Sequence, residues 1–470
     1  MKHIYSILIL LFISSLVTAQ DKKETYEDAD ATFIRGIYDV ALTEGKAYDW
    51  LNYITNTIGG RLSGSPQAAS AVEYTRQMMD SMGMDVTLQP CEVPHWVRGD
   101  KEQVRVVNST SMGTVELTVL ALGNSVGTSD YGVTAPVIEV QGLDEVKELG
   151  AAGKIKGKIV FYNRPMDQTK IKTFHAYGGA VDQRGHGAAI AANFGAVGVI
   201  VRSMTLRTDD IPHTGALSYQ FLEKGVEPIA GLAVSTQDAD LLSAIIKNDK
   251  EVQLYMKTNC RMLKPKTSYN VIGEIKGSEF PDEIILVGGH LDSWDVGTGA
   301  HDDGAGCVHS MDVYHILKQL NYQPKRTIRV VMFMNEENGL AGGKEYAKIS
   351  NEKGEKHLAC IESDRGGFTP RGFSAEYNDV TLPMFKKVVS WMPLFKPYGL
   401  ELEKGGSGAD IGPLRSQNGL LVGLAPDSQR YFDYHHTPID VWDAVNKREL
   451  QLGAAAMASL VYMMDKYGLD

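Results

Sequence analysis

The residues that could do chemistry are histidines and carboxylates that follow apolar runs of strand length in the second half of the chain. They are His290, Asp292, Asp302, Asp303, Glu336, Glu337 and Asp364, with His435 and His436 near the C-terminus. The carboxyl ends of parallel strands meet at one edge of a sheet, so we expect these side chains to converge there. Unpaired carboxylates would repel one another, and mixed histidine and carboxylate donors suit zinc or a related divalent cation. The pattern therefore predicts a metal centre.

The number of candidate ligands is sufficient for two ions. Two divalent ions about 3.5–4 Å apart can share one bridging carboxylate and a bridging water, and two histidines with three carboxylates then complete the protein ligands. A further carboxylate that does not touch metal would take the proton from that water. Glu336 and Glu337 can supply one group of each kind, because neighbouring residues that leave a strand point in different directions.

Motifs of other catalytic classes do not occur in the sequence. It contains no His-Glu-x-x-His and no Gly-x-Ser-x-Gly, and Gly339–Lys344 is too short for a phosphate-binding loop and is followed by Glu345 instead of Ser or Thr. The cysteines form no Cys-x-x-Cys pair, so we expect small buried residues, with a disulfide between the first two left open. These cysteines are Cys91, Cys260, Cys307 and Cys360.

Strand-like and helix-like segments alternate from Tyr269 to the C-terminus. The strand-like runs are Ile284–Val287, Ile328–Met334, Leu358–Ile361 and Leu420–Leu424, and the helical patterns are Gly304–Leu320, Ala341–Ser350, Leu382–Trp391 and Leu450–Met464. Nearly continuous apolar strands in such an alternation indicate a mostly parallel sheet covered by helices on both faces. The predicted fold class is therefore α/β.

Two earlier segments have other patterns. Ser65 and Pro66 begin a predicted helix over Gln67–Met82, since serine is a common helix cap and proline is tolerated in the first turn. From about Thr114 to Lys257, short β-rich runs are interleaved with small-residue helices. That change in the pattern of strand-like and helix-like segments indicates an inserted domain.

Length, charge and the N-terminus limit what the protein can contact. A chain of 470 residues exceeds what one core usually supports, and 47 basic against 58 acidic residues give a net charge of −11, which argues against a nucleic-acid or anionic-membrane partner. Residues 1–19 have a basic start, a short apolar run and a small-residue end, which is typical of a signal peptide cleaved after Ala19. No later segment has the pattern of a membrane span, so the mature protein is expected to be exported, either secreted or periplasmic.

Three motifs resemble those of a known family. Ile58–Pro66 is similar to its opening motif, Tyr269–Gly277 to the entry of its catalytic core, and Lys156–Val160 with Phe194–Ile200 to a protease-associated insert domain. With the metal pattern, they make the chain resemble the M28 family of zinc metallopeptidases, in particular its plasma glutamate carboxypeptidase (carboxypeptidase Q) branch, over nearly the whole mature chain. The resemblance implies a zinc-exopeptidase, phosphorylase/hydrolase-like fold, with a mostly parallel mixed sheet flanked by helices.

The resemblance and the change of texture together divide the chain. The expected parts are a signal peptide over 1–19, the N-terminal part of a catalytic domain over 20–113, an inserted β-rich, protease-associated-like lid domain over 114–265, and a zinc peptidase core over 266–470.

Carried onto the matching positions, the resemblance implies a role for each site residue. The implied ligands are His290 and Asp364 for one zinc, Glu337 and His436 for the other, and Asp302 bridging both, with Glu336 as the general base. Asp302 is preferred to Asp303 because the family's ligand is the first Asp of the pair. His436 is preferred to His435 because the ligand directly precedes a Thr or Ser.

Supporting roles are expected for residues beside these ligands. Asp292 should hydrogen-bond the imidazole of His290 and orient it, with a turn cap as the alternative. Asp440 should cap or orient the loop of His436. Gly405–Asp410 resembles a substrate-side loop, with a surface turn as the alternative. The remaining histidines are expected to pack or support instead of binding metal, because the ligand count is complete without them; they are His435, His301, His309 and His315.

The predicted function is that of an exported exopeptidase with two zinc ions per chain, which hydrolyses dipeptides or short peptides through a metal-bridging hydroxide. The insert would cover the metal edge and admit only short peptide substrates. A homodimer is expected by analogy, and no nucleic-acid or membrane partner is expected. The alternatives are an aminopeptidase acting on longer peptides, a single-zinc transferase like glutaminyl cyclase, and a non-catalytic receptor-like relative. The sequence leaves open which peptide terminus is read.

Overall fold

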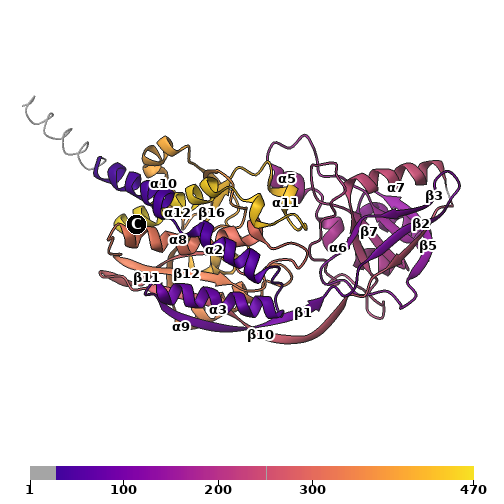
Figure 1. The fold of residues 1–470 in the computed structure, drawn as a ribbon, viewed down its shortest axis with the longest axis horizontal. Helices are drawn as coiled ribbons and strands as arrows, with labels where there is room; N and C mark the ends of the chain where they lie inside the picture. Colours follow the sequence, from indigo (N-terminus) through magenta and orange to yellow (C-terminus); the bar gives the residue numbers. More distant parts are fainter. Residues whose placement is uncertain (1–27, 250, 470) are drawn as a thin grey trace, which may run out of the picture.

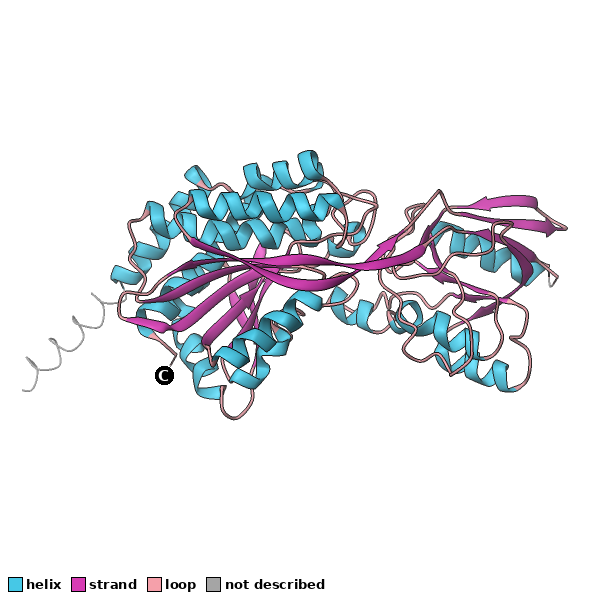
Figure 2. Ribbon diagram, turned by 90° about the horizontal axis from the view of Figure 1, so that it is seen from below, coloured by secondary structure: helices cyan, strands magenta, loops and turns pink. Residues whose placement is uncertain are grey.

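A long two-stranded ribbon connects two lobes of the molecule (Figures 1 and 2). The computed structural model describes residues 28–249 and 251–469, so the signal peptide predicted over 1–19 lies outside the described residues. The ribbon consists of β1 (Asp85–Val97) and β10 (Arg261–Ile275), which pair antiparallel. The chain leaves the first lobe along β1 and returns to it along β10, so the second lobe is an insertion.

The sheet of the first lobe contains the strands predicted from the sequence. Its eight strands have the order β1-β10-β12-β11-β13-β16-β14-β15. Besides the ribbon they are β11 (Phe280–His290), β12 (Arg326–Phe333), β13 (Lys356–Glu362), β14 (Pro370–Glu376), β15 (Glu401–Lys404) and β16 (Leu420–Pro426). Strands β12, β11, β13 and β16 run parallel at its centre, whereas β10 and β14 pair antiparallel with their neighbours β12 and β16. The predicted mostly parallel mixed sheet is confirmed.

Helices cover both faces of this sheet (Figure 2). One face packs against α2 (Ala47–Asn52), α3 (Pro66–Ser81), α8 (Ala305–Gln319), α10 (Leu382–Phe395) and α12 (Lys447–Tyr467). The opposite face packs against α9 (Ala341–Lys353) and the short helix η4 (Gly412–Gln417). Alternate residues of the buried strands face the two layers, as the period of a strand requires. Helix α3 begins as predicted, with Ser65 Oγ accepting a hydrogen bond from Ala68 N.

The second lobe has an eight-stranded sheet of its own, in the order β3-β2-β9-β5-β6-β7-β8-β4. Its strands are β2 (Gln103–Ser109), β3 (Gly113–Leu117), β4 (Val119–Ala121), β5 (Val133–Val140), β6 (Ile159–Tyr162), β7 (Gly198–Arg202), β8 (Gly231–Val234) and β9 (Gln253–Lys257). Its helices are α4 (Leu143–Ala151), α5 (Thr173–Gly178), α6 (Asp182–Asn193) and α7 (Thr236–Asn248). Apolar clusters pack on both faces of the sheet.

This sheet begins earlier in the chain than the sequence indicated. The expected insert started at 114, but β2 already belongs to the second sheet, where it pairs antiparallel with β9. The pairing joins the beginning of the insertion to its end. Local sequence patterns do not reveal such a long-range contact. The start of the insertion was therefore expected at residue 114, after β2.

The cysteines answer a further expectation. All four cysteines are buried and free, Cys91 and Cys260 included, as expected of small core residues. Among the helices that the structure describes, none combines the length and the apolar character needed to cross a membrane.

Candidate metal centre

The candidate ligands lie where the parallel strands of the first sheet end. They are His290 at the end of β11, Asp302 in the turn before α8, Glu337 after β12, Asp364 after β13 and His436 in the loop after β16. The turn that carries Glu337 carries Glu336 as well. These side chains converge at one edge of the sheet, and all are buried except those of Asp364 and Glu336, which are partly exposed.

The ligands form two triads that share one carboxylate. In the first, His290 Nε2 lies 3.2 Å from Asp302 Oδ1 and 3.4 Å from Asp364 Oδ1. In the second, His436 Nε2 lies 3.2 Å from Asp302 Oδ2 and 3.2 Å from Glu337 Oε2. Each oxygen of Asp302 therefore faces a different histidine, as a bridging ligand between two ions would.

The distances from each histidine to its two carboxylates fit tetrahedral zinc. Ligand atoms about 2.0–2.1 Å from a tetrahedral ion lie roughly 3.3–3.4 Å from one another. The observed separations are 3.2 to 3.4 Å. In addition, Asp302 Oδ2 is shielded from solvent, and apart from its ion-pair contacts with His435 and His436 it makes no hydrogen bond within the described chain. A buried carboxylate oxygen of this kind needs a partner, and a cation in the triad would supply it.

Burial and mutual repulsion disturb the acid–base behaviour of the cluster. Burial raises the pKa of Glu337 to about 7, and the charge of Asp302 adds to the rise. Burial also raises the pKa of Glu336 well above its ordinary value, with contributions from Asp364 and Glu337. Burial alone would lower the pKa of His290, but Asp302 and Asp364 hold it well above the usual range. The cluster is therefore suited to binding cations.

The two carboxylates of the Asp302-Asp303 pair point in different directions. Asp303 accepts hydrogen bonds from His290 N and Gly306 N, both at 3.0 Å, so it lies against the start of α8. Only Asp302 of this pair has an oxygen in each triad. The geometry therefore favours Asp302 as the bridging residue, the choice drawn from the resemblance.

His435 lies beside the second triad. Its ring stacks on His436 with 3.5 Å between centroids, and its Nε2 is 3.7 Å from Asp302 Oδ2. His436 approaches both Asp302 and Glu337 more closely, so it is the better placed ligand. The three other histidines that were expected to pack or support have partners away from the triads. His301 stacks on Phe368, His309 contacts Ser363, and His315 contacts the backbone of Glu44.

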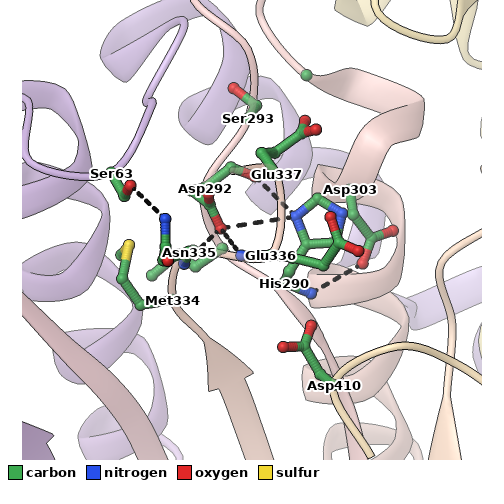
Figure 3. A network of polar contacts seen from close by, with 12 residues as sticks. Ser63, His290, Asp292, Ser293, Asp303, Met334, Asn335, Glu336, Glu337 and Asp410 are labelled. Carbon is green, nitrogen blue, oxygen red and sulfur yellow. Dashed lines mark hydrogen bonds and ion pairs between the residues drawn. The ribbon is translucent and has the colours of Figure 1, made fainter. Parts of the chain in front are cut away.

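Asp292 supports the site differently from the expectation. The ring of His290 contacts the backbone carbonyl of Asp292, with 3.0 Å from Nδ1 to O, whereas the nearest carboxylate oxygen is 3.8 Å away. The carboxylate instead accepts hydrogen bonds from Asn335 N at 2.7 Å and Glu336 N at 3.0 Å (Figure 3). One residue thus orients a ligand through its backbone and positions the expected base through its side chain.

Asp440 contacts the loop that carries Asp302 as well as the loop of His436. Its carboxylate accepts hydrogen bonds from His301 N at 2.7 Å and Asp302 N at 3.1 Å. Its backbone N–H donates to the Thr437 carbonyl at 3.3 Å, so Asp440 also closes the loop that follows His436. The carboxylate contact with Asp302 spans 138 positions and was not expected from the sequence.

The segment Gly405–Asp410 is partly exposed and contacts the end of β13. Ser407 and Asp410 are buried, and backbone N–H groups of the segment donate to Glu362 at the end of β13. Burial and the charge of Glu362 raise the pKa of Asp410 well above its ordinary value. Figure 3 shows Asp410 on the same side of the network as His290. The burial of Ser407 and Asp410 favours a supporting role for this end of the segment, while Gly406 is exposed.

Sequence reasoning did not single out two residues that hold the ligand loops. Arg61 is buried and donates three hydrogen bonds to the loop between His290 and Asp302, at the carbonyls of Leu291, Thr298 and Gly299. Arg61 lies in the opening motif Ile58–Pro66, and the resemblance of that motif to the M28 family was the only feature of the sequence that could have drawn attention to it. Thr214 of the insertion donates its N–H to the His436 carbonyl at 3.0 Å, and its own carbonyl lies 3.3 Å from His436 Nδ1.

A cavity of about 250 Å³ lies over the triads, between the two lobes. Its metal-facing side is lined by Asp302, Glu336, Glu337, Asp364, His435 and His436. The insertion contributes Phe174, Tyr177, Arg184 and Ala216, and the short helix α11 (Tyr431–Tyr434) contributes Tyr431 and Phe432. Side chains of both lobes therefore enclose the space where a substrate would meet the metal centre.

Comparison with known proteins gives consistent matches. Residues 270–461 match Peptidase family M28. Carboxypeptidase Q from Bos taurus is 32% identical over 424 residues, which cover 90% of this chain and 85% of that protein. The crystal structure of a Peptidase M28 precursor from Shewanella amazonensis has a TM-score of 0.86 and 34% identity, over 93% of this chain and 97% of the other. A zinc aminopeptidase from Bacillus subtilis has the same fold, with a TM-score of 0.62 at 20% identity over 88% and 94% of the two chains.

The family model covers only the core, whereas the matches to Carboxypeptidase Q and to the Shewanella structure extend over 90% and 93% of this chain. They confirm the resemblance first seen in the motifs, the fold class, and the predicted enzyme class of a metallo-exopeptidase. The chain belongs to peptidase family M28.

Proposed function

We propose that the chain is an exported di-zinc exopeptidase that hydrolyses dipeptides or short peptides. One observation carries the proposal: the two carboxylate oxygens of Asp302 each lie 3.2 Å from Nε2 of a different histidine. His290 and Asp364 would hold one zinc, Glu337 and His436 the other, and Asp302 would be shared.

The chain's own residues would carry the proton. When bound, two zinc ions would lower the pKa of a shared water and polarise the scissile carbonyl. Glu336 belongs to neither triad and lines the cavity, so it would accept a proton from the attacking water and deliver it to the leaving amine nitrogen. Asp292 would fix the place of this base, since it holds the backbone N–H of Glu336.

The size of the cavity supports a short substrate. Its volume of about 250 Å³ is below the roughly 300–1,000 Å³ of pockets that hold drug-sized ligands. We infer that the insertion acts as a lid that excludes long chains. The similarity to Carboxypeptidase Q supports an exopeptidase. Export is proposed from the N-terminal segment, and a homodimer from analogy.

The rival functions would require a different ligand set. A single-zinc transferase has no need of a shared carboxylate, and a non-catalytic relative would have lost ligands. Both triads and the separate carboxyl of Glu336 are present in the described chain.

Metal analysis and peptide hydrolysis on one preparation test the proposal. We expect two zinc ions per chain at the two triads in an anomalous-scattering map, and cleavage of dipeptides with free termini. Asp302→Ala should reduce both ions, whereas Asp443→Ala, which changes an exposed carboxylate, should retain both. A single ion, or equal cleavage of dipeptides blocked at both ends, would contradict the proposal.

A further inference from the structure

A second and larger space lies between the lobes, beside the cavity over the triads. Its volume is about 640 Å³, against about 250 Å³ for the metal-site cavity. The insertion lines it with residues between Ile171 and His175, and the first lobe lines it with parts of β14, β15 and the end of β16. We call this space the side cleft. The proposed hydrolysis makes no use of it.

One side chain is common to both spaces. Among the described residues, only Phe174 lines the metal-site cavity and the side cleft alike. The main chain also passes from one space to the other between two neighbouring residues, since Asp364 lines the cavity and Arg365 lines the side cleft. The two spaces therefore meet at the ring of Phe174.

Contacts with the first lobe hold this ring in place. Phe174 lies in the first turn of α5, which faces α11 at the junction of the lobes (Figure 1). Its ring stacks on Tyr431 with 5.3 Å between centroids and meets Phe432 edge-on at 4.9 Å. The guanidinium carbon of Arg365 lies 5.5 Å from the centroid of the ring. Aromatic and cation–π packing of this kind gives the ring a defined position, so it forms a wall between the two spaces.

We propose that Phe174 sets the upper limit on substrate length by closing the metal-site cavity off from the side cleft. The inference rests on the proposed function and names the residue that makes the enzyme select short peptides. A dipeptide stays within the cavity, whereas a longer peptide has to pass the ring. Without the ring, the rest of a longer peptide would extend into the side cleft.

The side cleft has the chemistry to hold the rest of a peptide. Its charged side chains include two exposed ion pairs, Lys172–Glu403 at 2.5 Å and Arg371–Asp427 at 2.9 Å. Arg365 already donates hydrogen bonds to a serine hydroxyl and a backbone carbonyl of the first lobe. Charges that have partners do not require an ionic ligand. Donors and acceptors of both kinds are therefore available to the N–H and C=O groups of a peptide main chain.

The test measures the preferred substrate length of the zinc-loaded enzyme with alanine peptides. Wild type should cleave dialanine and disfavour tetra-alanine. Phe174→Ala should raise the ratio of kcat/KM for tetra-alanine to kcat/KM for dialanine by roughly 10–200-fold, the range over which the fit of a pocket changes discrimination. Phe174→Leu keeps a bulky side chain at the wall and should give a smaller rise.

Two controls separate the loss of the ring from a loosening of the lobes. Thr173→Val removes the hydrogen bonds of Thr173 to the carbonyl and hydroxyl of Ser428, at 2.9 and 2.8 Å, but leaves the ring, so the ratio should stay at its wild-type value. Phe221→Ala makes the same exchange at a half-exposed ring of the insertion that lines neither space, and it should change nothing. Zinc content and thermal unfolding of each variant check that it folds.

An unchanged ratio in Phe174→Ala would overturn the proposal. An equal rise in Thr173→Val would overturn it too, because a loosened contact between the lobes would then explain the effect. So would a wild-type enzyme that cleaves both peptides equally well.

Calorimetry on the zinc-loaded protein tests the wall without turnover. If wild type cleaves no peptide, the proposed function fails, but Phe174→Ala should still gain affinity for tetra-alanine relative to dialanine. The same relative affinity in wild type and Phe174→Ala would show that the ring closes nothing off.

Discussion

Glu336 and Glu337 occupy different positions because the chain turns sharply after β12. Asn335 has a φ of 72°, and Asp292 accepts hydrogen bonds from the backbone N–H groups of Asn335 and Glu336. Glu337 instead contacts His436 and accepts a hydrogen bond from Trp294 N at 3.2 Å. The turn thus directs one carboxylate into a triad and leaves the other free at the cavity.

This division predicts that the two roles can be separated by mutation. Glu336→Gln keeps the shape of the side chain but cannot accept a proton, so kcat should fall by roughly 10²–10⁴-fold while zinc content stays at the wild-type level. Glu337→Gln should lower zinc content as well. Steady-state kinetics and elemental analysis measure the two effects, and a wild-type rate in Glu336→Gln would show that another group is the base.

Asp312 is a buried acid away from the metal centre. Its Oδ1 accepts a hydrogen bond from Lys46 N at 3.0 Å, and its Oδ2 is buried without a partner in the described chain. Burial raises its pKa to about 7, whereas an unfolded Asp has a pKa near 3.9. Between these values the unfolded chain releases the proton and the folded protein keeps it. The free energy of unfolding therefore falls as pH rises through this window.

Asp312→Asn should remove this dependence. The amide cannot ionise, so the variant should gain stability relative to wild type by up to about 1.4 kcal/mol per pH unit between about pH 4 and 7. Urea unfolding at several pH values gives the difference, and Asp443→Asn provides an exposed control. Parallel stability curves for Asp312→Asn and wild type would show that this carboxyl ionises normally.

At the scale of elements, a half-buried arginine ties the insertion to the loop that carries the ligands. Arg98, just beyond β1, contacts Asp295 through Nη2 at 2.7 Å and Nε at 2.9 Å, and Glu102 through Nη1 at 3.1 Å. Asp295 belongs to the loop that connects His290 with Asp302. The ribbon, the insertion and the metal loop therefore meet at one ion-pair network.

Breaking this network should destabilise the protein. Arg98→Met leaves Glu102 buried without a counter-ion, so the free energy of unfolding should fall by about 2–4 kcal/mol. Lys172→Met removes another pair between the lobes, Lys172–Glu403, which is exposed and should contribute less than about 1 kcal/mol. Urea denaturation compares them, and equal effects of the two substitutions would contradict the importance of burial.

The elements were predictable to the extent that local patterns determine them. The parallel strands are nearly continuous apolar runs, and α3 has a serine cap and an N-terminal proline, so the α/β core could be read from the sequence. The start of the insertion could not, because β2 finds its partner in β9 across most of the inserted lobe. For the same reason the contact of Asp440 with Asp302 was missed.

At the scale of the whole molecule, the candidate site depends on both lobes. Residue types alone indicated a metal cluster but left Asp302 and Asp303, and His435 and His436, as equal choices. The resemblance selected one of each, and the distances in the triads favour the same selection. The role of the second lobe at the site was not foreseen, because Thr214 and Arg184 belong to no metal or catalytic motif.

Removal of zinc should therefore affect the fold as well as catalysis. Without cations, the buried carboxylates of the triads repel one another, so chelation should abolish hydrolysis and lower the temperature of unfolding. Zinc at about 100 times its Kd should restore about 2.7 kcal/mol per site. Thermal unfolding across a zinc titration measures the effect, and identical curves with and without zinc would contradict it.

If the insertion covers the site as proposed, the hydrogen bonds between Thr214 and His436 would couple the passage of peptides to the retention of zinc. If the insertion swings outward to release a product, it withdraws partners from both the main chain and the ring of a metal ligand. Each turnover would then expose the zinc ion held by His436 to loss. Chelators in solution would therefore remove zinc faster from an enzyme that is turning over substrate than from one without substrate.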